Sequence, residues 1–346
     1  MSKEGIYGKT ARYDRDFLVS TENKKYKVTH LGDLCYNPAN LKFGVICLNT
    51  YGDAIFSPIY VTFEIEASFD PDFIGAYLTR WDFINRALKY QQGTVYERMA
   101  VSPEDFVSIK CCFPQKAEQT RLAEFITLLD KRIAAQGKYV ESLKKYKRGV
   151  VDGIFSRKLN FSYPQTWAEL EISELFMPIS DKGYSDKIVL TIVQGEGTMP
   201  RDSVDRRIAY DKSTISSYKR VLPNDFILHL RSFEGGLEIV NEEGVVSPAY
   251  TILRARNEII PLFFYTFFRS YWFINSKLRI SVEGIRDGKS INMNTFWHIK
   301  VPVPSIEEQR HISALISSID NRIKIAEFEY KRLLQIRVGL MQQLFI

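Results

Sequence analysis

Side chains able to catalyse a reaction or to bind a metal are few in this chain, and their spacing fits neither kind of site. The four histidines and the four cysteines do not occur at the short intervals that zinc ligands require. Gly288-Lys289-Ser290 ends like a phosphate-binding loop, but the glycine required five positions earlier is Glu283. We therefore predict no cofactor, no metal site and no catalytic residue, and we expect reduced cysteines in a cytoplasmic protein.

The composition is that of a globular protein with a modest excess of positive charge. The 346 residues are 45% hydrophobic and 25% charged, and the formal net charge is +6. This charge permits nucleic-acid binding without demanding it. The apolar run at residues 259–268 is too short to span a membrane and is followed at once by Arg269, so no membrane association is expected. The length allows two or three domains, each with its own core.

An internal repeat organises the chain. The stretch Pro114–Phe155 returns as Pro304–Phe345, at an offset of 190 residues and without a gap. Weaker matches at the same offset, or at an offset of 192, extend the repeat into the residues that precede each stretch. The chain therefore reads as module, long helix, module, long helix.

Each repeated stretch carries an apolar stripe with alternating spacings of four and three residues, which is typical of a coiled coil. Pro at the start of each stretch and none inside it favour one continuous helix per copy. About 40 residues at ~1.5 Å per residue give a rod of about 60 Å. We expect the two helices to pack as an antiparallel pair with pseudo-two-fold symmetry. The predicted seam consists of Ile126, Leu129, Ile133, Val140, Leu143, Val150, Ile316, Ile319, Ile323, Tyr330, Leu333 and Leu340.

The modules predict an α+β fold, with mixed β-sheet and helices in each of two homologous domains. The expected boundaries are 1–113 for the first module, 114–156 for the first long helix, 157–303 for the second module and 304–346 for the second long helix. In the first module, residues 71–88 have helical spacing and Phe106–Phe113 reads as a strand. Residues 157–190 have no counterpart before Met1. Either the first module lacks an opening strand, or the C-terminal end of the chain lies nearby and covers the gap.

A doubled motif marks the start of each long helix. It reads I-K-x-x-x-P-x-x-x-E-Q and then I-x-x-L-D-x-R-I, and it stands at Ile109–Ile133 and again at Ile299–Ile323. The helices also end alike, with R-G-V-V-D-G-I-F at 148–155 and V-G-L-M-Q-Q-L-F at 338–345. This pattern resembles the specificity (S) subunit of type I restriction–modification enzymes. The resemblance covers nearly the whole chain and departs from the family in the short first module.

The resemblance implies a DNA-binding protein without catalysis of its own. In that family two target-recognition domains each read one half of a split, asymmetric sequence in double-stranded DNA, and the paired helices act as a spacer. The S subunit docks two methyltransferase (M) subunits for adenine-N6 methylation, and motor–nuclease (R) subunits join this M–S core for cleavage. The (Asn/Asp)-Pro-Pro-(Tyr/Phe) loop of the methyltransferases is approached here only by Asn37-Pro-Ala-Asn40, which agrees with a non-catalytic role.

Candidate DNA contacts follow from the chemistry of the duplex and from the loops in which the two copies differ. Lys and Arg suit phosphates, whereas Arg, Asn and Gln at loop tips suit base edges in the major groove. The candidates in the first module are Lys24, Lys25 and Lys27 near the backbone, and Gln91, Gln92, Thr94 and Arg98 in the loop 91–98. The candidates in the second module are Lys219 and Arg220 on phosphates, and Arg231, Arg279, Arg286, Lys289 and Asn292 near the loops 229–237 and 282–292.

Two other hypotheses stay open at this point. One is a coiled-coil adaptor whose modules bind protein, which predicts no DNA affinity and no dependence of binding on salt. The other is a silent or partial specificity subunit whose first module has decayed, which predicts either recognition of a single half-site or a need for a second copy. A helical rod of about 60 Å exceeds one turn of DNA (~34 Å) and so suits a split site.

Overall fold

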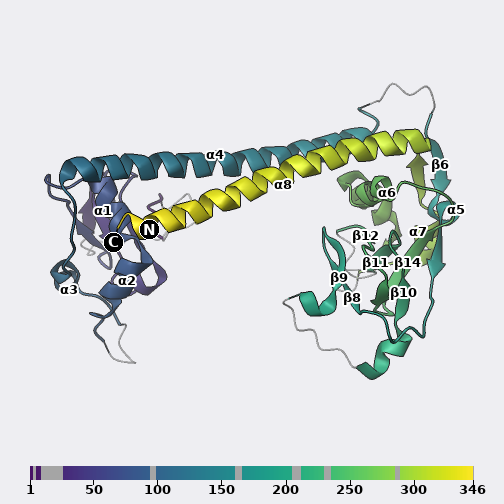
Figure 1. Ribbon diagram of the computed structural model, residues 1–346, viewed down its shortest axis with the longest axis horizontal. Coiled ribbons are helices and arrows are strands. Elements are labelled where there is room, and N and C mark those ends of the chain that lie inside the picture. The colour runs from purple at the N-terminus through teal and green to yellow at the C-terminus, as the bar shows by residue number, and fades with distance from the viewer. Residues whose placement is uncertain are drawn as a thin grey trace. The chain divides into compact units, whose positions relative to one another are not determined.

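The computed structural model describes most of the chain. The described residues are 1–2, 5–8, 26–93, 99–159, 166–204, 212–229, 235–284 and 289–345. Two long helices dominate it, α4 (Lys116–Phe155) and α8 (Ile306–Gln343) (Figure 1). Both are uninterrupted, as the repeated heptad stripe predicts.

The chain divides into two compact units, each of which takes in one module and parts of both long helices. The first unit is Met1–Gln136 with Glu329–Ile346, and the second is Gly137–Phe328. The predicted boundaries set the helices apart as segments of their own, whereas the contacts join the helices to the modules. Each module is therefore packed as one body with the helix segments beside it.

Within each unit α4 and α8 are antiparallel, and equivalent ion pairs hold them together. In the first unit, Arg337 Nη2 lies 3.0 Å from Asp130 Oδ2. In the second unit, Lys147 Nζ lies 2.6 Å from Asp320 Oδ1. The 190-residue offset converts one pair into the other, as an antiparallel pair of repeated helices requires. The helices and sheets of the two modules confirm the predicted α+β fold. Of the seam positions, Ile126, Ile133, Val140, Leu143, Val150, Ile316, Ile319 and Ile323 are buried, and Leu129, Tyr330, Leu333 and Leu340 are half-buried.

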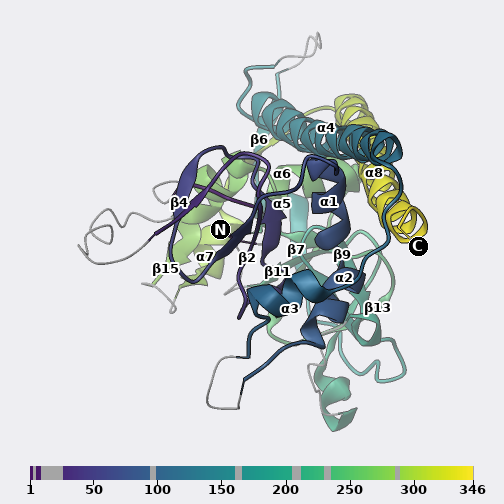
Figure 2. The same ribbon diagram turned by 90° about the vertical axis from the view of Figure 1, so that its left-hand side faces the viewer.

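The first module places three helices against short antiparallel strands (Figure 2). A sheet has the strand order β3-β2-β5, and β1 pairs separately with β4. Tyr36 on β2 is fully buried and stacks on Phe106 of α3, with 4.6 Å between the ring centroids. The elements are β1 (Lys27–Thr29), β2 (Leu34–Tyr36), β3 (Ile46–Leu48), β4 (Ala54–Phe56), β5 (Val61–Phe63), α1 (Pro71–Leu78), α2 (Trp81–Leu88) and α3 (Pro103–Ser108).

The second module repeats this plan and adds strands to it. Its main sheet has the order β12-β11-β14-β7, in which β11, β12 and β14 correspond to β2, β3 and β5. The pair β10–β13 corresponds to β1–β4. The elements are β6 (Ala168–Glu171), α5 (Ile172–Leu175), β7 (Phe176–Ile179), β8 (Leu190–Val193), β9 (Gly197–Pro200), β10 (Lys219–Val221), β11 (Phe226–His229), β12 (Glu238–Ile239), β13 (Gly244–Val246), β14 (Tyr250–Ala255), α6 (Pro261–Phe268), β15 (Val282–Glu283), β16 (Ser290–Ile291), α7 (Met293–Trp297) and β17 (Lys300–Val303).

The strand predicted at Phe106–Phe113 is wrong in its first part. Helix α3 begins at Pro103, because the Ser102 hydroxyl accepts a hydrogen bond from the Asp105 N–H at 3.0 Å and Pro suits the first helical turn. Phe106 is then buried from a helix. The alternation of apolar residues suggested a strand and gave no sign of this cap. The single helix predicted over residues 71–88 is in fact two helices, α1 and α2, separated at Thr79-Arg80.

The last turn of each long helix completes the core of a module. Phe155, at the end of α4, packs on Phe263 and Phe267 in the second unit. The equivalent Phe345, after α8, packs on Phe73 and Tyr77 in the first unit. The C-terminal end of the chain therefore lies in the first module, at the place that Phe155 takes in the second, and the positions of β6 and β7 have no counterpart among the described residues of the first module.

Neither a membrane span nor a metal cluster is found in the part of the chain that the structure describes. No described helix combines the length and the apolar character that a bilayer crossing needs. No three His, Cys, Asp or Glu among the described residues are placed to hold a metal ion.

The four thiols are free and should differ sharply in reactivity. Burial raises the pKa of Cys47 to about 11 and shifts the pKa of Cys35 in the same direction, so both thiols stay neutral at pH 8. Cys112 is exposed. We expect iodoacetamide at pH 8 to label Cys112 in the native protein and to label Cys35 and Cys47 only after denaturation, as read by mass spectrometry. Labelling of Cys35 or Cys47 at the rate of Cys112 would contradict the burial.

Candidate nucleic-acid interface

A buried glutamine ties the start of each long helix to its module. The Gln119 side chain donates to the Pro114 carbonyl at 2.8 Å and accepts from the Asp70 N–H at 3.0 Å. Gln309 makes the equivalent bonds to the Pro304 carbonyl and the Ile260 N–H, both at 3.0 Å. Both glutamines are almost fully buried. This gives the E-Q of the doubled motif a physical role that the sequence alone did not reveal, which is to fix the module on the helix.

A β-hairpin precedes the last short helix of the second module and carries the candidates of the loop 282–292. Strands β15 and β16 pair antiparallel, and Lys289 and Arg279 beside them are exposed. Asn292 has a structural task, since its side chain caps α7 by accepting from the Thr295 N–H at 3.1 Å. Arg286 lies outside the described residues. Exposed positive charge thus lies beside the β15–β16 pair and next to the capped start of α7.

The first module has a counterpart at the same place. Gln92 and Ala100 form a β-bridge, and the Gln91 side-chain amide Nε2 donates to the Met99 carbonyl at 3.0 Å. The Gln92 side chain donates to Asp105 at 3.1 Å, next to the Ser102 cap of α3. The candidates Thr94 and Arg98 lie outside the described residues. In both copies, therefore, two paired strand segments lie next to a helix that a side chain caps.

The candidates assigned to phosphates lie on equivalent strands but differ in availability. Lys27 on β1 is exposed. Its equivalent on β10, Lys219, donates to the Tyr250 carbonyl at 2.7 Å, and burial lowers its pKa. Arg220 lies 2.9 Å from Glu243 and over the Tyr184 ring. Both second-module cations are thus engaged within the protein, while Lys24, Lys25 and Arg231 lie outside the described residues.

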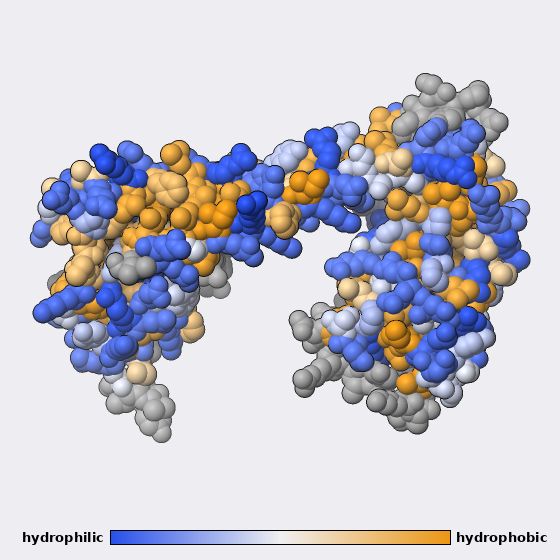
Figure 3. Space-filling view, in the orientation of Figure 1, coloured by the Kyte–Doolittle hydropathy of each residue, from blue (hydrophilic) through white to orange (hydrophobic). Residues whose placement is uncertain are grey.

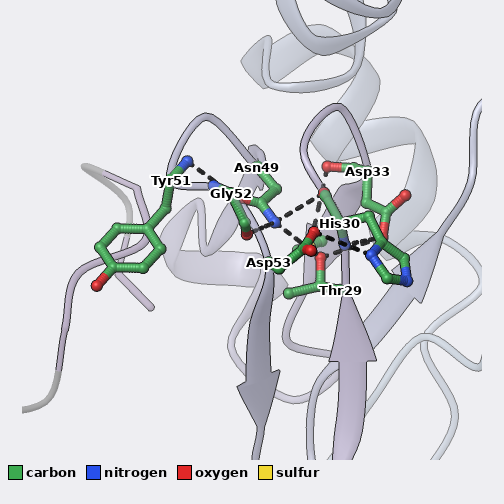
Figure 4. A network of polar contacts seen from close by, with 8 residues as sticks. Thr29, His30, Asp33, Asn49, Tyr51, Gly52 and Asp53 are labelled. Carbon is green, nitrogen blue, oxygen red and sulfur yellow. Dashed lines mark hydrogen bonds and ion pairs between the residues drawn. The ribbon is translucent and has the colours of Figure 1, made fainter.

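A network of turns beside β1 was missed by the sequence reasoning (Figure 4). The Asp33 carboxylate accepts from the His30 N–H at 2.7 Å, and Asn49 donates to the His30 and Gly52 carbonyls. Asp33 has an equivalent in the second module, Asp225, which accepts from the Leu222 N–H at 2.8 Å. The only sequence signal was the repeated aspartate in the turn after the first strand. His30 is exposed, and its hydrogen bond to Asp53 raises its pKa.

One protein family matches the second half of the chain. Residues 164–335, about half of the chain, match the type I restriction modification DNA specificity domain. Through this domain the chain belongs to the type I specificity-subunit family. The matched range spans the second module and most of α8, including the Gln309 tie and the β15–β16 hairpin. Because the first module repeats the same plan, the family architecture occurs twice in this member.

One curated relative also spans much of the chain. The putative type I restriction enzyme MjaX specificity subunit of Methanocaldococcus jannaschii is 21% identical over 287 residues, covering 78% of this chain and 66% of the relative. This chain therefore spans about two thirds of the length of that relative.

Solved structures show the same fold. The HsdS subunit from Thermoanaerobacter tengcongensis is 16% identical, with a TM-score of 0.54, covering 94% of this chain and 83% of that chain. A structure concerned with complex assembly and conformational transition of the type I R-M system is 17% identical, with a TM-score of 0.60, covering 94% of this chain and 84% of that one. At 16–17% identity these comparisons show a shared fold, and this chain shares it over nearly its whole length.

Proposed function

We propose that this chain is the DNA-specificity subunit of a type I restriction–modification complex and that its two modules read the two halves of an asymmetric DNA site. One observation supports this above the others. Both modules pair two strand segments at the same place, next to a capped helix: Gln92 with Ala100 in the first, and β15 with β16 in the second. The sequences between the paired segments differ in the two copies. A shared frame with divergent tips is what two readers of two different half-sites require.

The chain would bind double-stranded DNA and recruit catalysis from partners. Two methyltransferase subunits would supply adenine-N6 methylation, and motor–nuclease subunits would join through that core in the cytoplasm. The chain itself would contribute recognition and no chemistry.

The helix pair offers a surface for such partners. Figure 3 shows apolar side chains gathered over the parts of α4 and α8 that belong to the first unit. Phe125, Leu128 and Val338 are about half exposed or more. Apolar patches of this kind on a soluble protein mark contacts with other proteins. We assign this patch to a methyltransferase subunit.

The direct test is the methylome of cells that express this chain with its methyltransferase subunit, beside cells that lack this chain. A split methyladenine motif found only with the chain would establish the function and define both half-sites. A motif with one defined half would favour a partial specificity subunit. Absence of any motif while the complex still assembles would leave the protein-binding adaptor.

Two exposed cations beside the β15–β16 hairpin provide a prediction for binding. Arg279→Ala and Lys289→Ala should each weaken DNA binding and reduce the slope of log affinity against log salt by about 1, if each side chain contacts one phosphate. Fluorescence anisotropy of the assembled complex over a salt series measures both quantities.

The control for this pair is Lys131→Ala, which removes the same charge from an exposed position on α4. It should leave the slope unchanged. Equal slopes for all three variants would show that net charge, and not the hairpin, governs binding.

A further inference from the structure

The loop that joins β2 to β3 in the first module carries two exposed side chains at its tip. Lys42 is exposed, and Phe43 is 61% exposed. The Lys42 Nζ lies over the Phe43 ring, 5.2 Å from the ring centroid. An exposed phenylalanine is by itself common on protein surfaces. The construction of this loop and its place in the module set this one apart.

Hydrogen bonds and one buried side chain fix the conformation of the loop. The buried Asn37 side chain accepts from two backbone N–H groups of the loop, both at 3.1 Å. Leu41 is fully buried, and the Gly44 N–H donates to the Leu41 carbonyl at 2.8 Å. Gly44 has a φ of 76°, a conformation that suits glycine. The loop is therefore ordered before a partner arrives, which reduces the entropy lost when its exposed side chains bind.

Two hydrogen bonds attach this loop to the base of the candidate loop 91–98. The Val101 N–H donates to the Pro38 carbonyl at 3.3 Å, and the Tyr36 hydroxyl donates to the Val101 carbonyl at 3.0 Å. Val101 directly follows Ala100, which is one half of the β-bridge at the base of that candidate loop. The β2–β3 loop is thus anchored beside the loop that we assign to DNA.

The corresponding loop of the second module, between β11 and β12, has a related composition. It reads L-R-S-F-E-G-G-L at 230–237. Arg231 comes shortly before Phe233 there, as Lys42 comes before Phe43 in the first module. Arg231 is already a candidate for DNA contact by its type and place, whereas Lys42 was not among the candidates. Each copy therefore places a cation and a phenylalanine in the same inter-strand loop.

The charge of the surrounding sequence suits a polyanion. Lys42 is the only charged residue in the range 34–52, which contains no Asp or Glu. No carboxylate of this stretch would therefore repel a phosphate. Lysine neutralises phosphates, and phenylalanine is among the side chains that make apolar contacts with the methyl group of thymine in the major groove.

We propose that the β2–β3 loop is a second DNA-reading element of the first module. Lys42 contacts a phosphate of the half-site that this module reads, and Phe43 contacts a thymine methyl group in the same half-site. The proposal rests on the proposed function, to which it adds two contact residues and a chemical preference.

Two alanine variants separate the two contacts. The complex assembled with methyltransferase subunits is titrated with a duplex that carries the split site defined by the methylome, and with a duplex whose first half-site is scrambled. Phe43→Ala should weaken binding of the intact site by about tenfold, because a large apolar side chain is no longer buried on contact. It should weaken binding of the scrambled duplex much less. Lys42→Ala should weaken both alike and reduce the slope of log affinity against log salt by about 1.

Replacement of single thymines in the first half-site by deoxyuridine identifies the contacted base. Each replacement removes one methyl group from the DNA. At the contacted base it should weaken binding by the wild-type complex by about fourfold. The same replacement should have no further effect on the Phe43→Ala complex, because the contact is already lost.

Conservative variants and a matched control exclude a general effect on the protein. Phe43→Tyr keeps the ring and Lys42→Arg keeps the charge, so each should recover most of the loss seen with alanine. Phe328→Ala removes a 68% exposed ring from α8 and should leave both affinities unchanged. Urea unfolding of the first unit should be the same for all loop variants, since both side chains are exposed.

The outcomes distinguish this proposal from the proposed function. A wild-type complex that binds the intact and the scrambled duplex equally would refute both. A wild-type complex that discriminates between them, with Phe43→Ala and Lys42→Ala binding as tightly as the wild type, would overturn this proposal alone. Variants that no longer assemble with the methyltransferase subunits would show that the loop contacts protein, which would also overturn it.

Discussion

The variant Phe155→Ala should lose about 3–5 kcal/mol of unfolding free energy in the second unit, which is the range for truncating a buried Phe. The side chain is 2% exposed and lies with its ring centroid 5.0 Å from that of Phe267 and 5.6 Å from that of Phe263. These rings belong to α6, so the end of α4 and the module share one core. Denaturant unfolding with amide exchange as the local probe would measure the loss, and the loss of protection should concentrate in residues 137–328.

The repeat supplies a matched variant for this prediction. Phe345→Ala removes the equivalent ring from the first unit, where it contacts Phe73 and Tyr77 and lies under the Arg80 guanidinium. It should destabilise residues 26–136 and leave the second unit intact. Phe155→Leu, which keeps most of the apolar volume, should cost much less than the alanine variant. If either alanine variant loosened both units equally, the two cores would not be separate.

The second large effect is expected at Arg254. Its guanidinium makes two hydrogen bonds to Asp225, at 2.8 and 2.7 Å, and the Asp225 side chain is 3% exposed. Arg254→Ala leaves that carboxylate buried without its cation, which costs about 3–5 kcal/mol in comparable sites. We expect a fall of about 3 kcal/mol in the unfolding free energy of the second unit, measured in urea.

An exposed ion pair in the same unit is the control for Arg254. Arg310 and Glu258 lie 3.2 Å apart with side chains 57% and 75% exposed. Arg310→Ala should cost less than about 1 kcal/mol. A double variant, Arg254→Met with Asp225→Asn, should recover much of the stability lost in Arg254→Ala, because no charge is then left buried and the amide oxygen still accepts from the Leu222 N–H. If Arg310→Ala and Arg254→Ala cost the same, burial would not be the deciding factor.

The order of modules and long helices could be predicted from the sequence because the chain contains it as an internal repeat. The heptad stripe is long enough to define each helix, and it repeats at a single offset of 190 residues. Two like helices, each following a module, are expected to pack as an antiparallel pair. The exchange of Asp130–Arg337 for Asp320–Lys147 shows this symmetry within the separate units. The role of Gln119 and Gln309 could not be predicted, because their partners are backbone groups about fifty residues away.

Short elements and single site residues were harder to predict for physical reasons. The helix at Pro103–Ser108 depends on one side-chain cap, which outweighs the strand-like apolar residues after it. Asn292 was assigned to DNA from its type and place, yet the same amide suits the helix cap that it forms. Lys219 and Arg220 on β10 bind groups within the protein, and no sequence pattern predicts these contacts. The DNA contacts therefore remain predictions, and they are best sought first at the exposed Arg279 and Lys289.

Phe155 packs in the second unit and Phe345 packs in the first, and this arrangement has a consequence for synthesis on the ribosome. Phe155 is the last residue of α4 and contacts Phe263 and Phe267, which are made about a hundred residues later. The second module can therefore fold against a helix end that is already made. The first module must wait, because Arg80 and Phe345 are separated by 265 residues. Contacts this distant in sequence form late and slowly. During translation the first module would thus remain incomplete until residues 341–345 appear.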